Sequence, residues 1–262
     1  MVFTKATGSG NDFIIVDGRL ETVPDPVKLA QDLCRRHLSV GADGVLLLEK
    51  SGQAGFRMRI FNPDGSEAEM CGNGLRCFLL YLVRKGLAET ERFIDVETKA
   101  GLRRGKVSES LVTASLGEPK DLALSFPLDV DGKQLTASFV NTGVPHTVIE
   151  AEDLLTRFPV VELGRKIRFH PRFAPAGTNV DFVEIKDALI LIRTYERGVE
   201  DETLSCGTGT AAAGFVLHRL NKIHLPVKVQ AASGETLTVS EQDKEVFLSG
   251  EVRIIYEGVT PD

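Results

Sequence analysis

The stretch Met70-Cys71-Gly72-Asn73-Gly74-Leu75-Arg76-Cys77-Phe78-Leu79-Leu80 joins a cysteine, two glycines and a long apolar run. The run continues to Val83 and is apolar nearly all round, a pattern typical of a helix that is buried on every side. Lys85-Gly86 follows it as a C-terminal cap. A thiol in the first turn of such a helix lies at the positive end of the helix dipole, which favours the thiolate. We therefore predict a central buried helix with a reactive cysteine at its N-terminus.

The same pattern recurs about half a chain later. Ser205-Cys206-Gly207-Thr208-Gly209 precedes a second apolar run, 211–217. Asn11 precedes Cys71 by 60 positions, and His146 precedes Cys206 by the same 60. Each half reads as strands, a short helix, more strands, the cysteine helix and a closing hairpin. We therefore infer an internal duplication in which two thiols face one ligand; the alternative is a duplication without a shared site.

Local patterns predict the other elements. Val2 to Thr7 is expected to form a strand, and Asp25-Pro26 is expected to start a short helix that ends near His37. Residues 155–169 should hold the counterpart of that helix in the second half. The alternation in Thr236-Leu237-Thr238-Val239 favours antiparallel strands.

A boundary between the halves is expected at Leu116-Gly117-Glu118-Pro119-Lys120, where turn residues interrupt the strand pattern. We assign residues 1–117 to an N-terminal half and 118–249 to a C-terminal half, and we expect 250–262 to return to the first half as a strand.

Composition narrows the class of protein. The chain has 262 residues, of which 42% are hydrophobic and 26% charged, as in a soluble globular protein with a sizeable core. No apolar run has the length of a membrane span, and no signal peptide is visible, so we expect a cytoplasmic protein without membrane contact. The net charge is −6, Trp is absent, and the basic stretches 103–106 and 164–168 lack interleaved aromatic residues. Nucleic acid is therefore not an expected partner.

Four cysteines are present, and in a reducing cytosol we expect thiols rather than disulfides. Cys34 with His37 forms a lone Cys-x-x-His, a spacing too sparse for a metal site, so no metal is predicted. Cys34 lies on an apolar stripe and Cys77 lies inside the first apolar helix, so both are expected in the core.

Several blocks of the chain resemble, in order and spacing, the diaminopimelate epimerase family. They are Gly10–Phe13, Gly41–Gly44, Phe61–Ser66, Met70–Cys77, Pro145-His146, Gly177–Asn179, Glu196–Gly198 and Ser205–Gly209. The resemblance implies an α/β (α+β) fold of two pseudo-symmetric halves, each a curved, mostly antiparallel sheet wrapping a central helix, with the site in the cleft between them. In one departure, Val144 stands where many members have Asn, so that contact is missing unless Asn141 supplies it.

The resemblance also implies the activity, which is interconversion of LL- and meso-2,6-diaminopimelate without a cofactor, in lysine and peptidoglycan precursor biosynthesis. Members are commonly homodimers. An α-proton must leave one face of the carbon and return on the other, so two bases are needed, and Cys71 and Cys206 take these positions. By analogy with the family, Cys71 acts on the LL centre. Backbone N–H groups of both helix starts would bind the substrate carboxylate beside the reacting carbon; they belong to Gly72, Asn73, Gly207 and Thr208.

The distal end of the substrate carries a second ammonium and carboxylate. Arg197 suits the carboxylate and Glu196 the ammonium, and the resemblance adds hydrogen bonds from Asn11, Asn62 and Asn179. Asn141 and His146 are further candidates, and His146 either tunes a thiol, holds substrate or is structural. Arg76, Asp12, Asp43 and Glu69 are expected in structural, turn or cap roles.

Three other functions compete with this interpretation. A proline-racemase-like enzyme would share both cysteines but usually has Cys-Gly-His at the first turn, where this chain has Cys71-Gly72-Asn73. A cysteine hydrolase with Cys206 and His146 gives Cys71 no task. A redox module would pair Cys71 and Cys206 as a functional disulfide.

Overall fold

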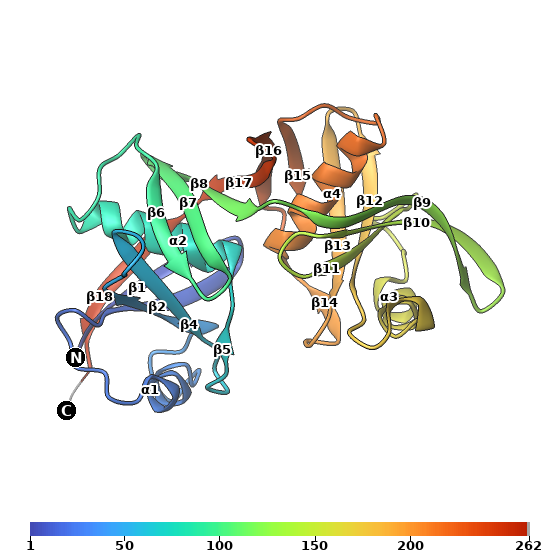
Figure 1. Cartoon of the computed structure of the whole chain (residues 1–262). Coiled ribbons are helices and arrows are strands. Elements are labelled where there is room, and N and C mark those ends of the chain that lie inside the picture. The colour runs from blue at the N-terminus through green and yellow to red at the C-terminus, as the bar shows by residue number, and fades with distance from the viewer. Residues whose placement is uncertain (261–262) are drawn as a thin grey trace. The chain divides into compact units, whose positions relative to one another are not determined.

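The computed structural model describes residues 1–260. The chain divides into two compact units (Figure 1). Unit 1 contains Met1–Ser115 and the chain from Ser249 onward, and unit 2 contains Leu116–Leu248. The chain passes from unit 1 to unit 2 within β8 (Leu111–Gly117) and returns within β17 (Glu245–Glu251).

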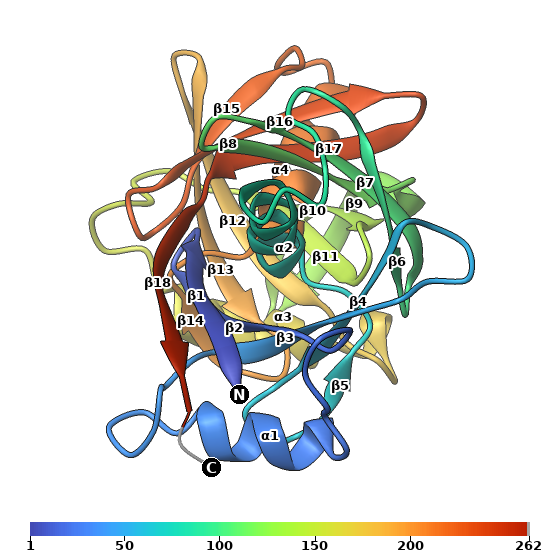
Figure 2. The same ribbon diagram turned by 90° about the vertical axis from the view of Figure 1, so that its left-hand side faces the viewer.

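Unit 1 surrounds helix α2 (Gly72–Arg84) with strands and carries the short helix α1 (Pro26–Leu33). Its other strands are β1 (Val2–Gly8), β2 (Asn11–Asp17), β3 (Gly44–Glu49), β4 (Phe56–Phe61), β5 (Glu67–Ala68), β6 (Ile94–Thr98), β7 (Gly101–Ser108) and β18 (Arg253–Val259). β2 runs parallel to β3 and β4 parallel to β6, whereas β1–β2, β3–β4, β4–β5 and β6–β7 are antiparallel. Figure 2 looks nearly along α2, with these strands around it.

Unit 2 repeats this arrangement around helix α4 (Gly207–Arg219). Its strands are β9 (Lys120–Val130), β10 (Lys133–Asn141), β11 (Pro145–Glu150), β12 (Asn179–Lys186), β13 (Leu189–Glu196), β14 (Asp201–Thr203), β15 (Val227–Gln230) and β16 (Thr236–Gln242). Helix α3 (Val160–Arg168) and the one-turn helix η1 (Pro171–Phe173) complete it. β11 runs parallel to β12 and β13 parallel to β15, whereas β10–β11, β12–β13, β13–β14 and β15–β16 are antiparallel.

The pairing order of unit 2 therefore matches that of unit 1 strand for strand. The expected fold class, two pseudo-symmetric α/β halves with mostly antiparallel strands around a central helix, is confirmed. The predicted strand at Val2–Thr7 and the antiparallel strands around Thr236–Val239 are also present.

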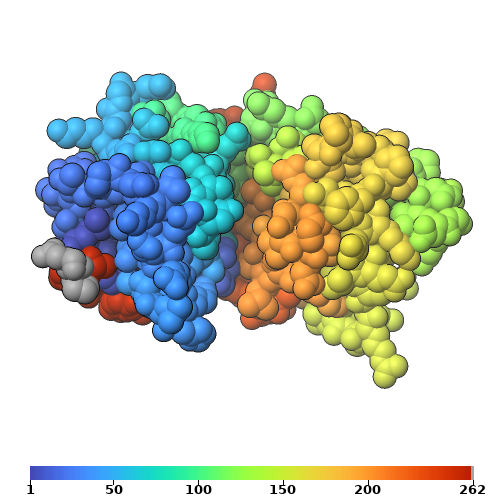
Figure 3. All heavy atoms as spheres, turned by 90° about the horizontal axis from the view of Figure 1, so that it is seen from below, coloured from blue at the N-terminus to red at the C-terminus, as the bar shows by residue number. Residues whose placement is uncertain are grey.

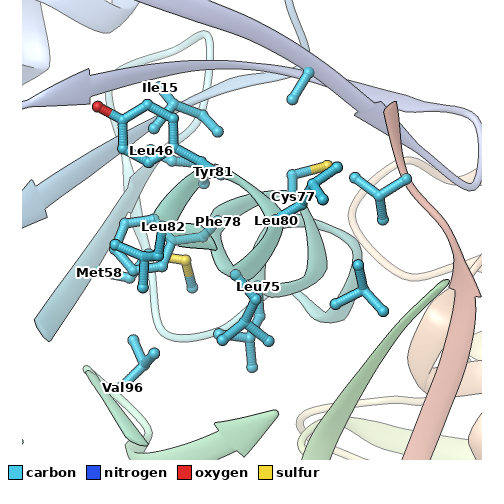
Figure 4. Packing of buried hydrophobic residues seen from close by; sticks show 14 of the residues in the cluster. Ile15, Leu46, Met58, Leu75, Cys77, Phe78, Leu80, Tyr81, Leu82 and Val96 are labelled. Atoms are coloured by element: carbon cyan, nitrogen blue, oxygen red, sulfur yellow. The ribbon is translucent and has the colours of Figure 1, made fainter. Parts of the chain in front are cut away.

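The two cysteine helices are buried, as their apolar character predicts. Leu75, Phe78 and Leu79 of α2 are fully enclosed by side chains from the surrounding strands, among them Ile15 and Met58 (Figure 4). The helix lies so close to β7 that a side chain at Gly105 would collide with the side chain of Leu79 in α2. Three fully buried alanines, 211–213, let α4 approach its own strands closely.

The short helix in unit 1 ends earlier than the sequence indicates. Asp25 caps it as expected, accepting from the N–H of Lys28 at 3.0 Å. The last helical residue is Leu33, not one near His37. His37 has a φ of 69°, and the carbonyl of Leu33 accepts from the N–H of Gly41 instead of continuing the helix. The counterpart, α3, lies within the expected 155–169 span.

The C-terminal strand belongs to unit 1. β18 pairs antiparallel with β1, with Val2 opposite Val259 and Thr4 opposite Glu257, and Figure 3 shows C-terminal residues in red among the blue residues of this unit. Over residues 1–260, no helix combines the length and the apolar character needed to cross a membrane.

Candidate active site

Cys71 is the N-cap residue of α2. Its backbone is extended, with φ −142° and ψ 118°, and its sulfur accepts from the N–H of Gly74 at 3.4 Å. The first N–H groups of any helix lack carbonyl partners within the helix. The half-buried thiol and the buried first-turn residues Gly72 and Asn73 therefore share one electropositive helix start.

The side chains of Asn11 and Asn73 are hydrogen-bonded to each other at this helix start. The side-chain amide of Asn73 donates to Oδ1 of Asn11 at 2.8 Å, and the amide of Asn11 donates to Asp43 at 3.0 Å. Arg76, fully buried one turn into α2, donates to Oδ1 of Asn73 at 2.8 Å and also to Ser9. Arg76 and Asp43, for which structural or turn roles are expected, therefore orient the side chains of Asn73 and Asn11.

A charged cluster lies behind Asn11. Asp12 pairs with Lys5 at 2.8 Å and with Arg36 at 2.6 Å, and Arg36 also reaches Asp43 at 2.7 Å. Burial alone would raise the pKa of Asp12, but hydrogen bonds from Arg36 and Lys5 lower it below its ordinary value. Asp43, which accepts from Asn11, is thus held by Arg36, the same side chain that pairs with Asp12.

Asn62 closes the turn between β4 and β5. Its side chain donates to the Ser66 hydroxyl at 2.9 Å, and its backbone N–H donates to the Ser66 carbonyl at 2.8 Å. It stands nine residues before Cys71, as Arg197 stands nine residues before Cys206. Asn62 therefore lies at the strand end that is equivalent to the predicted carboxylate-binding position of unit 2.

Cys206 is the N-cap residue of α4, and its backbone is likewise extended, with φ −122° and ψ 110°. Its half-buried sulfur lies 3.4 Å from the hydroxyl of Thr208. Burial raises the pKa of this thiol well above its ordinary value, and the carboxylates of Glu196 and Asp181 act in the same direction. The helix start alone favours a thiolate, but desolvation and two nearby carboxylates outweigh it here, so the neutral thiol is the resting form.

A chain of hydrogen bonds leads from Cys206 into the core of unit 2. Nε2 of His146 lies 2.9 Å from the Thr208 hydroxyl, and Nδ1 lies 2.7 Å from the Asp181 carboxylate. Asp181 also accepts from the Thr194 hydroxyl at 2.8 Å. His146 and Asp181 are both fully buried, so His146 reaches the cysteine only through Thr208 and presents no atom to a ligand.

Gly209 is required by this packing. A side chain there would collide with the carboxylate of Asp181 and lie 3.3 Å from Cε1 of His146. Because Gly209 has no side chain, the imidazole of His146 and the carboxylate of Asp181 can pack against the first turn of α4.

The two units use equivalent positions for different chemistry. Asn11 with Asn73 in unit 1 corresponds, at the same 60-residue offset from each cysteine, to His146 with Thr208 in unit 2. The pair in unit 1 consists of two amides, whereas the pair in unit 2 joins an imidazole to a hydroxyl.

Asn179, Glu196 and Arg197 meet at the adjoining strand ends of unit 2. The side chain of Asn179 accepts from the N–H of Arg197 at 2.8 Å and donates to the carbonyl of Pro145 at 2.9 Å. Asn179 thus positions the Arg197 backbone, and the guanidinium donates to the carbonyl of Ala176 at 3.2 Å. Burial raises the pKa of Glu196, and the charge of Asp181 adds to this rise, whereas Thr203 and His146 lower it.

Asn141 lies apart from this group. It is the last residue of β10, and its side-chain oxygen accepts from the N–H of Gly143 at 3.0 Å. It therefore shapes the turn before Pro145, where Val144 accepts from the N–H of Thr142 at 3.2 Å through its backbone carbonyl.

The sequence-based analysis missed Asp181, Thr194 and the hydroxyl of Thr208. Asp181 could have been found from its position, because it is a charged residue within the otherwise apolar stretch 180–183 of β12. Burial of a charge is costly unless the charge is paired. Cys34 and Cys77 are core thiols, as expected. Among residues 1–260, no three His, Cys, Asp or Glu side chains gather as a metal-binding group.

Solved structures of low sequence identity share the fold. A phenazine biosynthesis protein of the PhzF family from Bacillus anthracis superposes with a TM-score of 0.71 at 16% identity, covering 98% of each chain. A probable proline racemase from Agrobacterium radiobacter gives a TM-score of 0.73 at 17% identity, covering 99% of this chain and 92% of that chain.

Sequence relatives cover nearly the whole chain. The diaminopimelate epimerase of Aquifex aeolicus is 41% identical over 279 residues, covering 98% of this chain and 97% of the relative. That of Caldanaerobacter subterraneus is 41% identical over 278 residues, covering 98% of each. The model of the family described as diaminopimelate epimerase matches residues 3–121 and 138–255. With the fold and both cysteine-capped helices described above, these matches show that the chain belongs to the diaminopimelate epimerase family.

Proposed function

We propose that this protein interconverts LL- and meso-2,6-diaminopimelate, as an isomerase of lysine and peptidoglycan precursor biosynthesis. Membership of the family supports the substrate. The observation that carries the reaction type is the repeated helix start, a half-buried thiol as N-cap in each unit. Two equivalent thiols suit a reaction that removes a proton from one face of a carbon and returns one to the other.

In the proposed mechanism, the Cys71 thiolate takes the α-proton of the LL substrate and the Cys206 thiol delivers a proton to the opposite face. The raised pKa of Cys206 favours its neutral form, which makes it the donor in this direction. The reverse reaction exchanges the two roles. No organic cofactor or metal takes part in this scheme.

The carbanion would be stabilised through the adjacent carboxylate. We assign its recognition to the backbone N–H groups of Gly72, Asn73, Gly207 and Thr208, the first-turn residues of α2 and α4. Negative charge grows on the carboxylate as the proton leaves, so these fixed donors bind the transition state better than the substrate. The loss of one such donor typically costs about 3 kcal/mol of activation free energy.

The distal end of the substrate is assigned to Arg197 and Glu196, for the second carboxylate and ammonium. Asn179 supports this role because it fixes the backbone of Arg197. Asn11 and Asn62 are assigned to substrate binding by unit 1. Asn141 and His146 are assigned a supporting role without direct contact to the substrate. We also propose a homodimer in the cytoplasm, in line with the resemblance and with no role for nucleic acid or membrane.

Conversion of LL-diaminopimelate in D2O tests this function. The reduced protein, without added cofactor, should yield the meso isomer with deuterium at the inverted α-carbon, read by NMR and chiral chromatography. Cys71→Ser and Cys206→Ser should each lower kcat at least about 100-fold, because each removes one of the two acid–base groups. Full activity in either variant would contradict the two-base scheme, and absence of exchange in the intact wild type would contradict the function.

A further inference from the structure

The turn that carries Glu196 and Arg197 is closed by one carboxylate, that of Glu200. Its Oε1 accepts from the N–H of Gly198 at 3.0 Å, and its Oε2 accepts from the hydroxyl of Tyr195 at 3.3 Å. The backbone N–H of Glu200 donates to the carbonyl of Glu196 at 2.8 Å. Glu200 has a φ of 60°, a conformation that a residue with a side chain keeps only when its surroundings hold it there. The geometry of the turn therefore depends on the contacts of Glu200.

Arg168, the last residue of α3, binds this carboxylate from the other side. Its Nε donates to Oε1 of Glu200 at 3.1 Å, and its Nη2 lies 3.1 Å from the same oxygen. The side chain of Arg168 is only 14% exposed. Burial alone would raise the pKa of Glu200, but the N–H of Gly198 and the charge of Arg168 lower it below its ordinary value. The two side chains thus form an ion pair at neutral pH.

The same guanidinium packs against a second segment that holds Arg197. A side chain at Gly177 would collide with the guanidinium of Arg168 and would meet its carbonyl oxygen at 2.7 Å. Ala176, the preceding residue, accepts from the Arg197 guanidinium at 3.2 Å, and Asn179 accepts from the Arg197 N–H at 2.8 Å. Arg168 therefore lies between the two segments that fix Arg197, the turn on one side and the chain before β12 on the other.

We propose that Arg168 and Glu200 are positioning residues for recognition of the distal end of the substrate. Their ion pair holds the turn so that Arg197 and Glu196 meet the second carboxylate and ammonium, and the inference rests on the proposed function for the identity of these groups. The distal groups do not change during the reaction, so contacts to them bind the substrate and the transition state equally. Loss of the ion pair should therefore raise KM and leave kcat nearly unchanged.

Kinetics of LL-diaminopimelate conversion test this role. Arg168→Gln and Glu200→Gln should each raise KM at least about tenfold and change kcat less than about threefold, because each removes a charged hydrogen bond that positions the turn. Glutamine at position 200 keeps an oxygen that can accept from Gly198 and Tyr195, so this variant removes chiefly the ionic contact. The double variant should raise KM no further than the stronger single variant, since both substitutions remove the same pair.

Lys166→Gln is the matched control. Lys166 lies in the same helix and pairs with Asp131 at 3.1 Å and with Glu162 at 2.9 Å, so its loss should leave both KM and kcat unchanged. Wild-type KM in Arg168→Gln and Glu200→Gln would overturn the proposal, and so would a loss of kcat at unchanged KM. Glu200→Gln decides the matter alone if Arg168→Gln fails to fold.

A second measurement needs no substrate. In hydrogen–deuterium exchange of the free protein, the amides of residues 197–200 should exchange at least about threefold faster in Arg168→Gln than in the wild type or Lys166→Gln, because the turn loses its support. Unchanged exchange of these amides would overturn the positioning role even in an active enzyme. Faster exchange in a protein whose wild type does not convert diaminopimelate would contradict the proposed function and leave the support of the turn by Arg168 standing.

Discussion

Glu196 has a proposed role toward the substrate ammonium and, separately, an electrostatic effect on the Cys206 thiol. Burial contributes most to the raised pKa of Cys206, and the carboxylate of Glu196 contributes next. A negative charge near a thiol disfavours the thiolate, so removal of that charge acts in the opposite direction. The two effects are separable because the thiol titrates in the absence of substrate.

We therefore expect Glu196→Gln to lower the pKa of Cys206. The midpoint of the pH profile for Cys206 alkylation, measured without substrate, should move to lower pH. Asp201→Asn is the control, since this exposed carboxylate five residues later is not among the groups that contribute most to the pKa of Cys206. A midpoint that stays in place or moves to higher pH would show that Glu196 does not act on the thiol.

The cysteines and their following glycines were predictable because a short motif and a long apolar run specify a helix start from local sequence alone. The side chains behind them were not. Whether His146 touches a ligand or supports one depends on the parallel pairing of β11 with β12, which brings Asp181 to the ring from 35 residues away. A lone asparagine such as Asn62 carries the same ambiguity, and the structure shows its side chain closing a turn.

At the level of elements, α2 is held by complementary packing more than by its own helix propensity. Leu79 is fully buried and lies against Gly105 in β7, where the strand has no side chain. A cavity at this contact would remain largely unfilled because the surrounding core is close-packed. The end of α1 depends on other features. His37 adopts a positive φ, and the N–H of Gly41 bonds to the carbonyl of Leu33, and neither feature can be read from the spacing of apolar residues.

Leu79→Ala should destabilise unit 1 by about 3 kcal/mol, the cost of lost burial plus a cavity. In hydrogen–deuterium exchange, amides of α2 that exchange through unfolding of the unit should then exchange about 100-fold faster, since each 1.4 kcal/mol is tenfold. Leu20→Ala is the control, because Leu20 is 84% exposed and its truncation should change exchange by less than about twofold. Equal protection of α2 in both variants would rule out this packing argument.

Over the whole molecule, duplication supplies two similar helix starts and divergence makes them chemically distinct. Unit 1 places charged residues around an amide pair, and unit 2 places a buried carboxylate behind an imidazole. The order of strands, the two thiols and the burial of both helices follow from repeated patterns in the sequence. The differences between the units do not, because they depend on which side chains meet across neighbouring strands.

The buried thiol of Cys34 should make the stability of the protein fall at alkaline pH. Cys34 is 4% exposed, and burial raises its pKa from 9.0 to about 11. Since the folded pKa lies above the unfolded one, the stabilisation is complete below pH 9.0 and is lost as the pH rises to about 11. This displacement corresponds to about 2 to 3 kcal/mol of unfolding free energy.

Cys34→Ala removes the contribution of this thiol to the pH dependence of the unfolding free energy and leaves the contributions of the other titratable groups. Burial also raises the pKa of Tyr81, to about 12, but Tyr81 titrates alike in both proteins and cancels in the comparison. At neutral pH the variant should be less stable by about 1 kcal/mol, from lost packing. Urea unfolding from neutral pH to about pH 11 should show the wild type losing about 2 to 3 kcal/mol more than the variant, so that the two curves cross. Curves that stay parallel over this range would mean that Cys34 ionises as readily in the folded protein as in the unfolded chain.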